Sequence, residues 1–355
     1  MTGDGSTPLE SLETPALGID VARLERNLER WQRYCDEAGL ANRPHVKTHK
    51  SIEIARRQVE LGARGITCQK LGEAEVMVEA GIDDVLIPYN LLGNGKLERL
   101  SSLLRRARIS VSVDDERLLG GLAAAARTAG RELEVSVECD TGMGRAGVQS
   151  PEAAVELAAA IAGADGLRFG GFVTYPAPAG AAAFLQAAVD GARACGLEVP
   201  VVSAGGTPGM WHARELMPTV TEYRAGTYAF HDRATVAAGA AGLEDVAVTV
   251  HATVASRPTR DRAIVDAGSK ALAYDPGPGS GHGLILEAQG SVIETLTEEH
   301  GHVRVCAPDR LELGDRVRIV PNHVCVVSNL FDEFWIARDG AAVDRWPVAA
   351  RGRSQ

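Results

Sequence analysis

The sequence predicts an α/β protein, with a (β/α)₈ TIM-type barrel followed by a C-terminal antiparallel β-domain. From about residue 20 to residue 230, apolar β-branched runs alternate with helical patterns, which is typical of a parallel sheet built from βαβ units. After about residue 240, short alternating strands are separated by turn residues. We therefore expect a barrel over residues 15–238 and a β-domain over residues 239–355 that also includes the N-terminal segment 1–14.

The expected helices of the barrel follow from their apolar spacing and their first residues. Residues 21–40 repeat apolar side chains at helical spacing, at Leu24, Leu28, Trp31 and Cys35. A later helix is expected to begin near residue 150. There Ser150 can cap the first turn, and Pro151 can occupy the first helical position because its missing N–H costs nothing there.

Eight apolar runs are expected to form the parallel strands of the barrel. They are 44–47, 65–69, 84–89, 109–114, 134–140, 169–175, 199–205 and 221–226. The active site of such a barrel lies at the carboxyl ends of its strands. Polar residues and glycines stand where these runs stop. That composition also suits plain turns, but Lys47 at the end of the first run favours a site.

The expected strands of the second domain are shorter and closer together. They are 246–256, 262–266, 284–286, 301–306, 316–319, 324–329, 333–336 and 342–346. Turn residues between neighbouring runs indicate antiparallel pairing.

Charge and composition argue against several classes of partner. The chain has 37 Lys and Arg against 47 Asp and Glu, a formal net charge of −10, which repels nucleic acids and anionic membrane surfaces. No stretch reaches the roughly 18 apolar residues needed to span a bilayer, and the start has no apolar targeting segment. The six cysteines have no framework spacing, as in a reducing compartment. We expect a cytoplasmic protein.

A basic cluster surrounds Lys47, in the run Arg43-Pro-His-Val-Lys-Thr-His-Lys50. Neighbouring positive charge and partial burial lower a lysine pKa, which leaves more free amine to attack a carbonyl carbon. Such an environment suits a Schiff-base lysine. A solvated basic surface would have the same composition.

Two glycine segments lie at the last two expected barrel strands. Ser203-Ala-Gly-Gly-Thr207 and Arg224-Ala-Gly-Thr-Tyr228 each follow an apolar run, where barrels commonly bind phosphate with backbone N–H groups. An imine-forming lysine facing a phosphate site fits pyridoxal 5′-phosphate (PLP). Asp140-Thr-Gly-Met-Gly-Arg145 ends the fifth strand, and Arg145 could hold a substrate carboxylate or the cofactor ring. Each glycine segment alone also suits a tight turn.

The pair His323-Val-Cys325 is the clearest metal candidate in the second domain. On a strand, residues i and i+2 point to one face, so an imidazole and a thiolate would project together. Nitrogen and sulfur suit zinc, and two protein ligands leave positions open for substrate and water. The alternative is a buried cysteine beside a hydrogen-bonded histidine.

Seven motifs of the chain together resemble those of one known family, the D-threonine aldolase and D-serine dehydratase family. They are Thr14-Pro-Ala-Leu, Arg43-Pro-His-Val-Lys-Thr-His-Lys50, Cys68-Gln-Lys, Asp140-Thr-Gly-Met-Gly-Arg, Asp266-Ala-Gly-Ser-Lys270, Glu299-His-Gly-His and Pro321-Asn-His-Val-Cys325. The family belongs to the alanine-racemase-like, fold-type III PLP enzymes. The resemblance extends from about residue 12 to residue 350.

The resemblance implies a PLP-binding barrel with a β-domain, in a homodimer whose active site lies near the subunit contact. Lys47 matches the Schiff-base lysine, and either Arg145 or Arg224 would face the pyridine nitrogen. Ala225 follows Arg224, at the position where alanine racemases have a proline after the corresponding arginine. The cofactor-binding candidates are Lys47, His45, Arg145, Tyr175, Ser203, Gly205, Gly206, Arg224, Gly226 and Thr227. His323 and Cys325 match the metal ligands, and Gln69 and His300 are substrate candidates.

The expected chemistry follows from an arginine beside the pyridine nitrogen, which keeps that nitrogen unprotonated and weakens PLP as an electron sink. A metal on the substrate's β-hydroxyl would compensate, either in elimination to a 2-oxo acid and ammonia or in retro-aldol cleavage. His-x-Cys resembles the zinc-dependent D-serine-type dehydratases, whereas the D-threonine aldolases have His-x-Asp with Mn²⁺ or Mg²⁺. Cys325 therefore predicts a D-serine or D-threonine dehydratase with zinc.

Three alternatives remain open: a D-threonine aldolase, an amino-acid racemase and a non-catalytic PLP-binding protein. Tyr274 stands where the family is expected to have a small residue, and in a racemase it could supply the second acid/base. A loop position for Tyr274 is the other interpretation.

Overall fold

The computed structural model describes residues 7–8, 11–178, 180–307 and 310–355. The chain divides into two compact units. The first, here called the β-unit, comprises the described residues of Met1–Arg30 together with Thr48–Glu53 and Thr227–Arg351. The second, the barrel unit, comprises Trp31–Lys47, Ile54–Gly226 and Gly352–Gln355. The predicted domain boundaries stay a prediction, and residues 1–6 and 9–10 of their N-terminal part lie outside the described residues.

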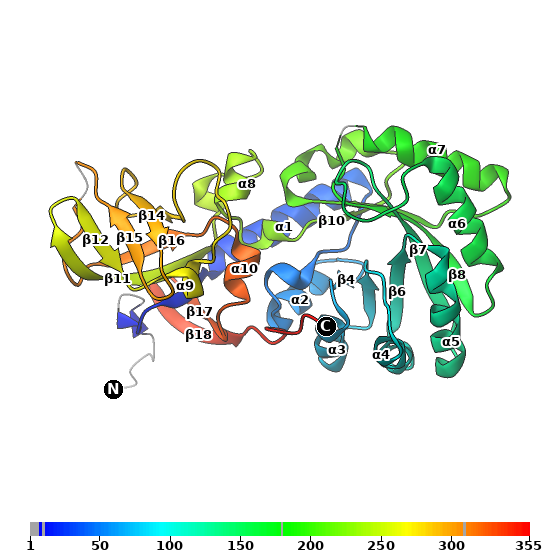
Figure 1. Ribbon diagram of the computed structural model, residues 1–355, viewed down its shortest axis with the longest axis horizontal. Coiled ribbons are helices and arrows are strands. Elements are labelled where there is room, and N and C mark those ends of the chain that lie inside the picture. Colours follow the sequence, from blue (N-terminus) through cyan, green and yellow to red (C-terminus); the bar gives the residue numbers. More distant parts are fainter. Residues whose placement is uncertain (1–6, 9–10, 179, 308–309) are drawn as a thin grey trace. The chain divides into compact units, whose positions relative to one another are not determined.

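The barrel unit contains a sheet of eight parallel strands with helices along its outside (Figure 1). In sheet order the strands are β3 (Ala41–Asn42), β10 (Glu222–Arg224), β9 (Val201–Gly205), β8 (Leu167–Thr174), β7 (Leu133–Cys139), β6 (Arg108–Val113), β5 (Asp84–Ile87) and β4 (Ile66–Thr67). A parallel bridge between His45 and Thr67 joins the segment after β3 to β4 and closes the ring. The predicted barrel is confirmed.

The helices of the barrel unit cover the outer face of its sheet (Figure 1). They are the later part of α1 (Val21–Ala38), most of α2 (Ile52–Glu60), and α3 (Leu71–Glu79), α4 (Asn94–Leu104), α5 (Leu119–Ala129), α6 (Pro151–Gly163) and α7 (Ala181–Ala194). In β6 every residue after the first is buried, as expected where helices cover the outer face. Ser150 caps α6 by accepting a hydrogen bond from Ala153 N at 3.2 Å, and Pro151 is the first helical residue, as predicted.

A buried arginine forms two ion pairs near the amino-terminal ends of the barrel strands. Arg43 is buried near the amino-terminal ends of the strands, where its Nε donates to Glu222 Oε2 at 2.8 Å and its Nη1 to Asp84 Oδ1. Glu222 begins β10 and Asp84 begins β5, so the ion pairs connect the two strands that flank β3 and β4 in the ring. Burial of Arg43 and Glu222 is tolerated because each charge has a partner, and Asp84 is partly buried beside them.

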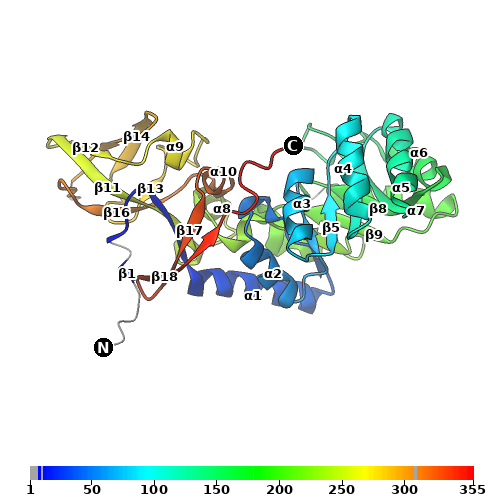
Figure 2. The same cartoon turned by 90° about the horizontal axis from the view of Figure 1, so that it is seen from below.

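The described residues of the β-unit form a ten-stranded sheet with several helices. The main order is β1 (Thr7–Pro8), β18 (Ala341–Pro347), β17 (Glu333–Arg338), β2 (Ala16–Asp20), β11 (Val248–Thr259), β12 (Arg262–Val265), β15 (Gly301–Arg304) and β14 (Val292–Leu296). Off this order, β16 (Arg316–Val320) pairs with β11 and β13 (Leu284–Ile285). Figure 2 shows β17 and β18 side by side. Pairing is antiparallel except between β17 and β2, so the predicted antiparallel β-domain is confirmed with one parallel exception.

Two predicted strands, 324–329 and 44–47, are wrong, and the first difference matters for the metal candidate. Residues 324–329 were expected to be extended, but Val324–Ser328 form the helix α10, with His323 at its N-cap position. A short apolar run such as Val-Cys-Val-Val has no periodicity that separates strand from helix. The prediction also missed β1, β2, β3 and β14. Residues 44–47 form a bridge at His45 and the start of a 3₁₀ turn, Val46–Thr48.

Candidate active site

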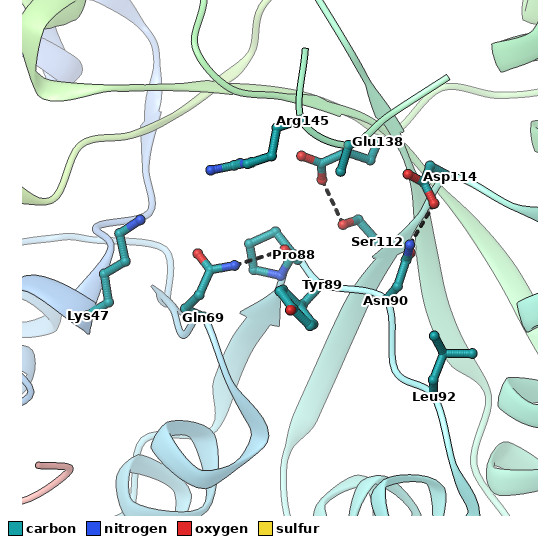
Figure 3. A pocket seen from close by; sticks show the side chains of 11 residues that line it. Lys47, Gln69, Pro88, Tyr89, Asn90, Leu92, Ser112, Asp114, Glu138 and Arg145 are labelled. Atoms are coloured by element: carbon teal, nitrogen blue, oxygen red, sulfur yellow. Dashed lines mark hydrogen bonds between the residues drawn. The ribbon is translucent and has the colours of Figure 1, made fainter. Parts of the chain in front are cut away.

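The barrel unit has a cavity of about 610 Å³ at the carboxyl ends of β4 to β7 (Figure 3). Its walls are formed by Lys47, Gln69, Pro88, Tyr89, Asn90, Leu92, Ser112, Asp114, Glu138, Arg145 and Ala146. In Figure 3 the ends of Lys47, Gln69 and Arg145 face the same space. The cavity therefore lies where a barrel enzyme binds its substrate.

Lys47 and Arg145 flank one aromatic ring. The Lys47 Nζ lies 5.8 Å from the centroid of the Tyr175 ring, and the Arg145 Cζ lies 5.2 Å from it. Tyr175 follows β8, whereas Arg145 belongs to the loop after β7. Three of the residues predicted as cofactor-binding are thus brought together from separate strands.

His45 is held neutral beside the cavity. Burial lowers the pKa of His45 well below its ordinary value, and the positive charges of Lys47 and Arg224 lower it further. The His45 Nε2 lies 3.0 Å from Gln69 Oε1, and the Gln69 Nε2 donates to Pro88 O at 3.3 Å. Because the Gln69 oxygen can only accept, the proton of the neutral ring is on Nε2. Gln69, a substrate candidate, reaches the cavity wall in this arrangement.

Arg224, at the end of β10, is a buried cation with unused hydrogen-bonding capacity. Its Nη2 donates to Thr174 O at 2.9 Å, but the buried Nη1 has no hydrogen-bond partner. Burial lowers the pKa of Arg224, and the nearby carboxylates of Glu138 and Glu222 oppose that effect. A buried N–H without a partner costs about 1–3 kcal/mol, so this atom is suited to a ligand acceptor. The ring nitrogen of PLP is an acceptor of this kind.

The two predicted phosphate segments of the barrel unit lie side by side. Arg224 pairs with Gly205 in the parallel ladder between β10 and β9. A Cβ on Gly205 would lie 2.8 Å from Arg224 O, and Gly206 has a φ of +123°, so both positions require glycine. Gly226 N donates to Thr207 Oγ1 at 3.3 Å. The backbone can therefore approach a phosphate closely, which fits PLP as the bound group.

Ser203 and Asp140 have partners within the protein. The Ser203 hydroxyl, fully buried in β9, donates to Glu222 Oε1 at 2.7 Å. Asp140 Oδ1 accepts from Gly142 N and Met143 N at 2.9 and 2.8 Å, and these bonds lower the pKa of Asp140. Asp140 thus holds the loop that carries Arg145.

Glu138 is a cavity residue that the sequence analysis missed. It lies in β7, and its Oε2 accepts from Ser112 Oγ at 2.8 Å (Figure 3). Burial raises the pKa of Glu138, while Arg224 opposes the shift. The signal for this residue was an acidic side chain inside an otherwise apolar strand run, a placement that is unusual unless the charge has a partner.

The second cluster of candidate residues belongs to the β-unit. Cys325 lies in the first turn of α10, with the Thr48 and Thr227 hydroxyl oxygens 3.2 and 3.7 Å from its Sγ. The predicted phosphate ligand Thr227 therefore has its hydroxyl beside the thiol. Thr48 is the residue after Lys47 in the chain.

His323 is paired with a buried carboxylate that the sequence analysis also missed. Its Nδ1 lies 3.2 Å from Asp232 Oδ2. Hydrogen bonds with Asp232 and Cys325 raise the pKa of His323 to about 10. Burial alone would raise the pKa of Asp232, but the hydrogen bonds from His323, Thr235 and Val324 lower it.

The donor set of this cluster suits a borderline metal such as zinc. Imidazole nitrogen and thiolate sulfur are both zinc ligands, and a carboxylate behind the imidazole is the usual outer partner of a metal-bound histidine. Among the described residues, no group of three or more His, Cys, Asp or Glu side chains could hold a metal. A metal here would have His323 and Cys325 as its protein ligands, with other positions left for substrate or water.

His300 and Tyr274 lie in turns of the β-unit. His300 is exposed in the turn between β14 and β15, with its Nδ1 3.5 Å from Thr297 Oγ1. The Tyr274 hydroxyl donates to Leu296 O, and its ring packs edge-on against His282. The Thr14 hydroxyl donates to Asp266 Oδ2, which joins the first and the fifth of the seven motifs.

The fold and the cavity define a barrel enzyme of the alanine-racemase type. Residues 19–234 match the model of the alanine racemase N-terminal domain, and residues 247–337 match that of a putative serine dehydratase domain. The chain is 38% identical to D-threonine aldolase of Arthrobacter sp., covering 98% of this chain and 95% of that protein. It is 35% identical to D-threo-3-hydroxyaspartate dehydratase of Delftia sp. (strain HT23), covering 95% and 97%.

Solved structures agree with these sequence relationships. D-threonine aldolase from Filomicrobium marinum superimposes with a TM-score of 0.91 at 36% identity, over 99% of both chains. The Delftia dehydratase superimposes with a TM-score of 0.86 at 33% identity, over 96% of this chain and 98% of that one. Two variants of that dehydratase replace a histidine and the cysteine two residues after it with alanine, and the cysteine variant is described as metal-free.

The chain therefore belongs to the D-threonine aldolase and D-serine dehydratase family of fold-type III, PLP-dependent lyases, as its motifs predicted. No helix in the described ranges is both long and apolar enough to cross a membrane.

Proposed function

We propose that this chain is a PLP- and divalent-metal-dependent lyase that dehydrates D-3-hydroxy amino acids to a 2-oxo acid and ammonia. The observation that carries the choice of dehydration is the pair His323 and Cys325 at the start of α10. The Delftia dehydratase has a histidine and a cysteine at the same spacing, and its metal-free cysteine variant supports a metal role for this pair.

The residues of the barrel unit fit PLP. The partnerless Nη1 of Arg224 would donate to the ring nitrogen, and the backbone at Gly205, Gly206 and Gly226 would receive the phosphate. Lys47 would hold the cofactor through its Nζ. When bound, PLP supplies the electron withdrawal that acidifies the α-C–H bond of an amino acid.

The chain's own groups would then divide the remaining work. Lys47 Nζ would take the proton from the substrate's α-carbon. Arg145, in the wall of the same cavity, presents a guanidinium fork that suits the substrate carboxylate. Glu138 balances the charge of Arg224, which stays protonated and so leaves the ring nitrogen without a proton.

His323 and Cys325 would hold the metal, with zinc as the expected ion because one ligand is a thiolate. The metal supplies Lewis acidity toward a hydroxyl leaving group. That contribution is needed because a ring nitrogen facing an arginine leaves the cofactor a weak electron sink.

Aldol cleavage is the second candidate reaction. It is favoured by the 38% identity to D-threonine aldolase of Arthrobacter sp. over nearly the whole chain. Both reactions begin at the same 3-hydroxy amino acid, and both use a metal on the hydroxyl. They differ in which bond breaks, the C–O bond in dehydration and the Cα–Cβ bond in aldol cleavage.

The test is to incubate the PLP- and zinc-loaded protein with D-threonine and identify the products. We expect 2-oxobutanoate and ammonia in equal amounts. Glycine and acetaldehyde instead would establish aldol cleavage and overturn dehydration. D-Serine and D-threo-3-hydroxyaspartate extend the test to other side chains, and the L-enantiomers serve as controls. No product from any of the three D-substrates would overturn the proposal as a whole.

Two further properties stay predictions. A homodimer would be seen as twice the chain mass of 37.4 kDa in light scattering. A cytoplasmic location would be seen by fractionation of the source cells.

A further inference from the structure

Asp232 occupies an unusual position between the first turns of two short helices of the β-unit. Its side chain is completely buried. Oδ1 accepts from Thr235 N at 2.8 Å and from Thr235 Oγ1 at 2.9 Å, which caps α8 (Arg233–Ala237). Oδ2 accepts from Val324 N at 3.0 Å and lies 3.2 Å from His323 Nδ1.

Capping α8 requires only one carboxylate oxygen, because a neutral Asn or Ser caps a helix as well as Asp does. The second oxygen of Asp232 is used entirely by α10. It contacts the side chain of His323 and the backbone of Val324, the residue between His323 and Cys325. Asp232 Oδ2 therefore holds the side chain of His323, the first residue of the predicted pair. It also holds the backbone of Val324, which connects His323 to Cys325.

The contact also determines which nitrogen of His323 can bind a metal. A carboxylate oxygen can only accept, so the ring hydrogen on this side is on Nδ1. In the neutral ring, Nε2 then has a lone pair available for a metal. A carboxylate behind a metal-binding histidine fixes the ring orientation and makes the histidine a better ligand.

We propose that Asp232 is the positioning residue of the His323–Cys325 metal pair, holding His323 in the tautomer and orientation that bind the metal. This inference rests on the metal role in the proposed function. Asp232 does not touch the substrate. Its effect passes through His323 and through the backbone of Val324.

The test compares Asp232→Asn with Thr235→Val in the PLP-loaded, metal-free full chain. Asn keeps a capping oxygen for α8, but its amide NH₂ can donate to Nδ1 and place the ring hydrogen on Nε2. Thr235→Val removes the other half of the capping box and leaves the pair with His323 intact. The probes are Zn²⁺, titrated against a chromophoric chelator, and Co²⁺, followed by its visible absorption.

We expect Asp232→Asn to weaken Zn²⁺ binding about 10- to 100-fold and to change the Co²⁺ ligand-field bands. Thr235→Val should lower the thermal midpoint while leaving Zn²⁺ affinity and the Co²⁺ spectrum at their wild-type values. If Asp232→Asn fails to fold, Asp232→Ser takes its place, since serine caps a helix but is too short to reach His323.

Two results would overturn the inference, and they can be told apart. If wild type and Asp232→Asn bind Zn²⁺ equally well with the same Co²⁺ spectrum, Asp232 has only a capping role and the metal site stands without it. If the wild type binds neither metal, the metal part of the proposed function fails, and the positioning role fails with it.

Discussion

In the barrel unit, the cavity side chains come from the carboxyl ends of successive parallel strands, so neighbours in sheet order are also neighbours around the cavity. In the β-unit, His323 and Cys325 stand at the beginning of the five-residue helix α10, held by a carboxylate from the beginning of α8. The barrel cavity is built from a strand-and-loop pattern that repeats along the sequence. The His323–Cys325 cluster depends on the contact between His323 and Asp232, which are distant in the sequence, so a single substitution can remove that contact without disturbing a sheet.

The largest expected effects are those of Lys47→Ala in the barrel cavity and of Cys325→Ala in the β-unit, and each should affect a different ligand. Lys47→Ala should abolish the visible absorbance of lysine-bound PLP and lower turnover about 10²- to 10⁴-fold, because a positioned base contributes that much. The Zn²⁺ affinity of Lys47→Ala should equal that of the wild type.

Cys325→Ala should lose Zn²⁺ but keep the PLP absorbance. Absorbance spectra and Zn²⁺ titration of the two variants provide the measurement.

Each of these variants has a matched control elsewhere in its own unit. Lys96→Ala removes another lysine of the barrel unit, and Cys306→Ala removes another partly buried cysteine of the β-unit. Both controls should behave like wild type. Retention of the PLP absorbance by Lys47→Ala would contradict the cofactor assignment, and retention of Zn²⁺ by Cys325→Ala would contradict the metal assignment.

The next effect contrasts two buried arginines of the barrel. Arg43 has two carboxylate partners, whereas Arg224 Nη1 has no partner. Arg43→Met should lower the free energy of unfolding by about 3–5 kcal/mol, because Glu222 and Asp84 lose their counter-charge. Arg224→Met should cost less stability and more PLP affinity. Urea unfolding and PLP titration of both variants measure the two effects.

A different outcome would change the interpretation of the barrel's two ends. If Arg224→Met destabilised the chain as much as Arg43→Met while PLP affinity stayed constant, Arg224 would be a structural group. The partnerless atom would then have no connection with the cofactor.

The barrel was predictable because its signals are local and repeated. Seven of the eight strands overlap predicted apolar runs, and polar residues or glycines follow them, so Lys47 and Arg145 could be assigned to the same side of a barrel from the order of the runs. The start of α6 at Ser150 and Pro151 was equally local. Glu138 was not predicted as a cavity residue because nothing in the sequence shows that Ser112 and Arg224 lie beside it.

The β-unit was less predictable because its decisive contacts join distant segments. The metal role of His323 and Cys325 stays a prediction, but the argument from a strand was wrong, since both residues lie at a helix N-terminus. Asp232 has a local signal, a capping box with Thr235. Its bond to His323 could not be inferred, because no spacing rule relates α8 to α10.

The smallest predicted effect concerns acid stability of the β-unit. His251 is buried in β11, and burial lowers its pKa from 6.5 to about 4, with Arg318 adding to the shift. The unfolded chain therefore binds a proton on this ring at a higher pH than the folded chain does. Stability should be intact above about pH 6.5 and decline as the pH falls toward 4, by at most about 3 kcal/mol from this group.

Two variants measure how much His251 contributes to the loss of stability at low pH. His251→Gln should make the loss of thermal stability between pH 7 and pH 4 shallower than in the wild type, because glutamine takes up no proton. His212→Gln, at an exposed position in the barrel unit, is the matched control. The imidazole lies tightly against the chain, since a Cβ on Gly18 would come within 2.6 Å of its Nε2. Equal slopes for wild type and His251→Gln would contradict the burial of His251 as a cause of acid destabilisation.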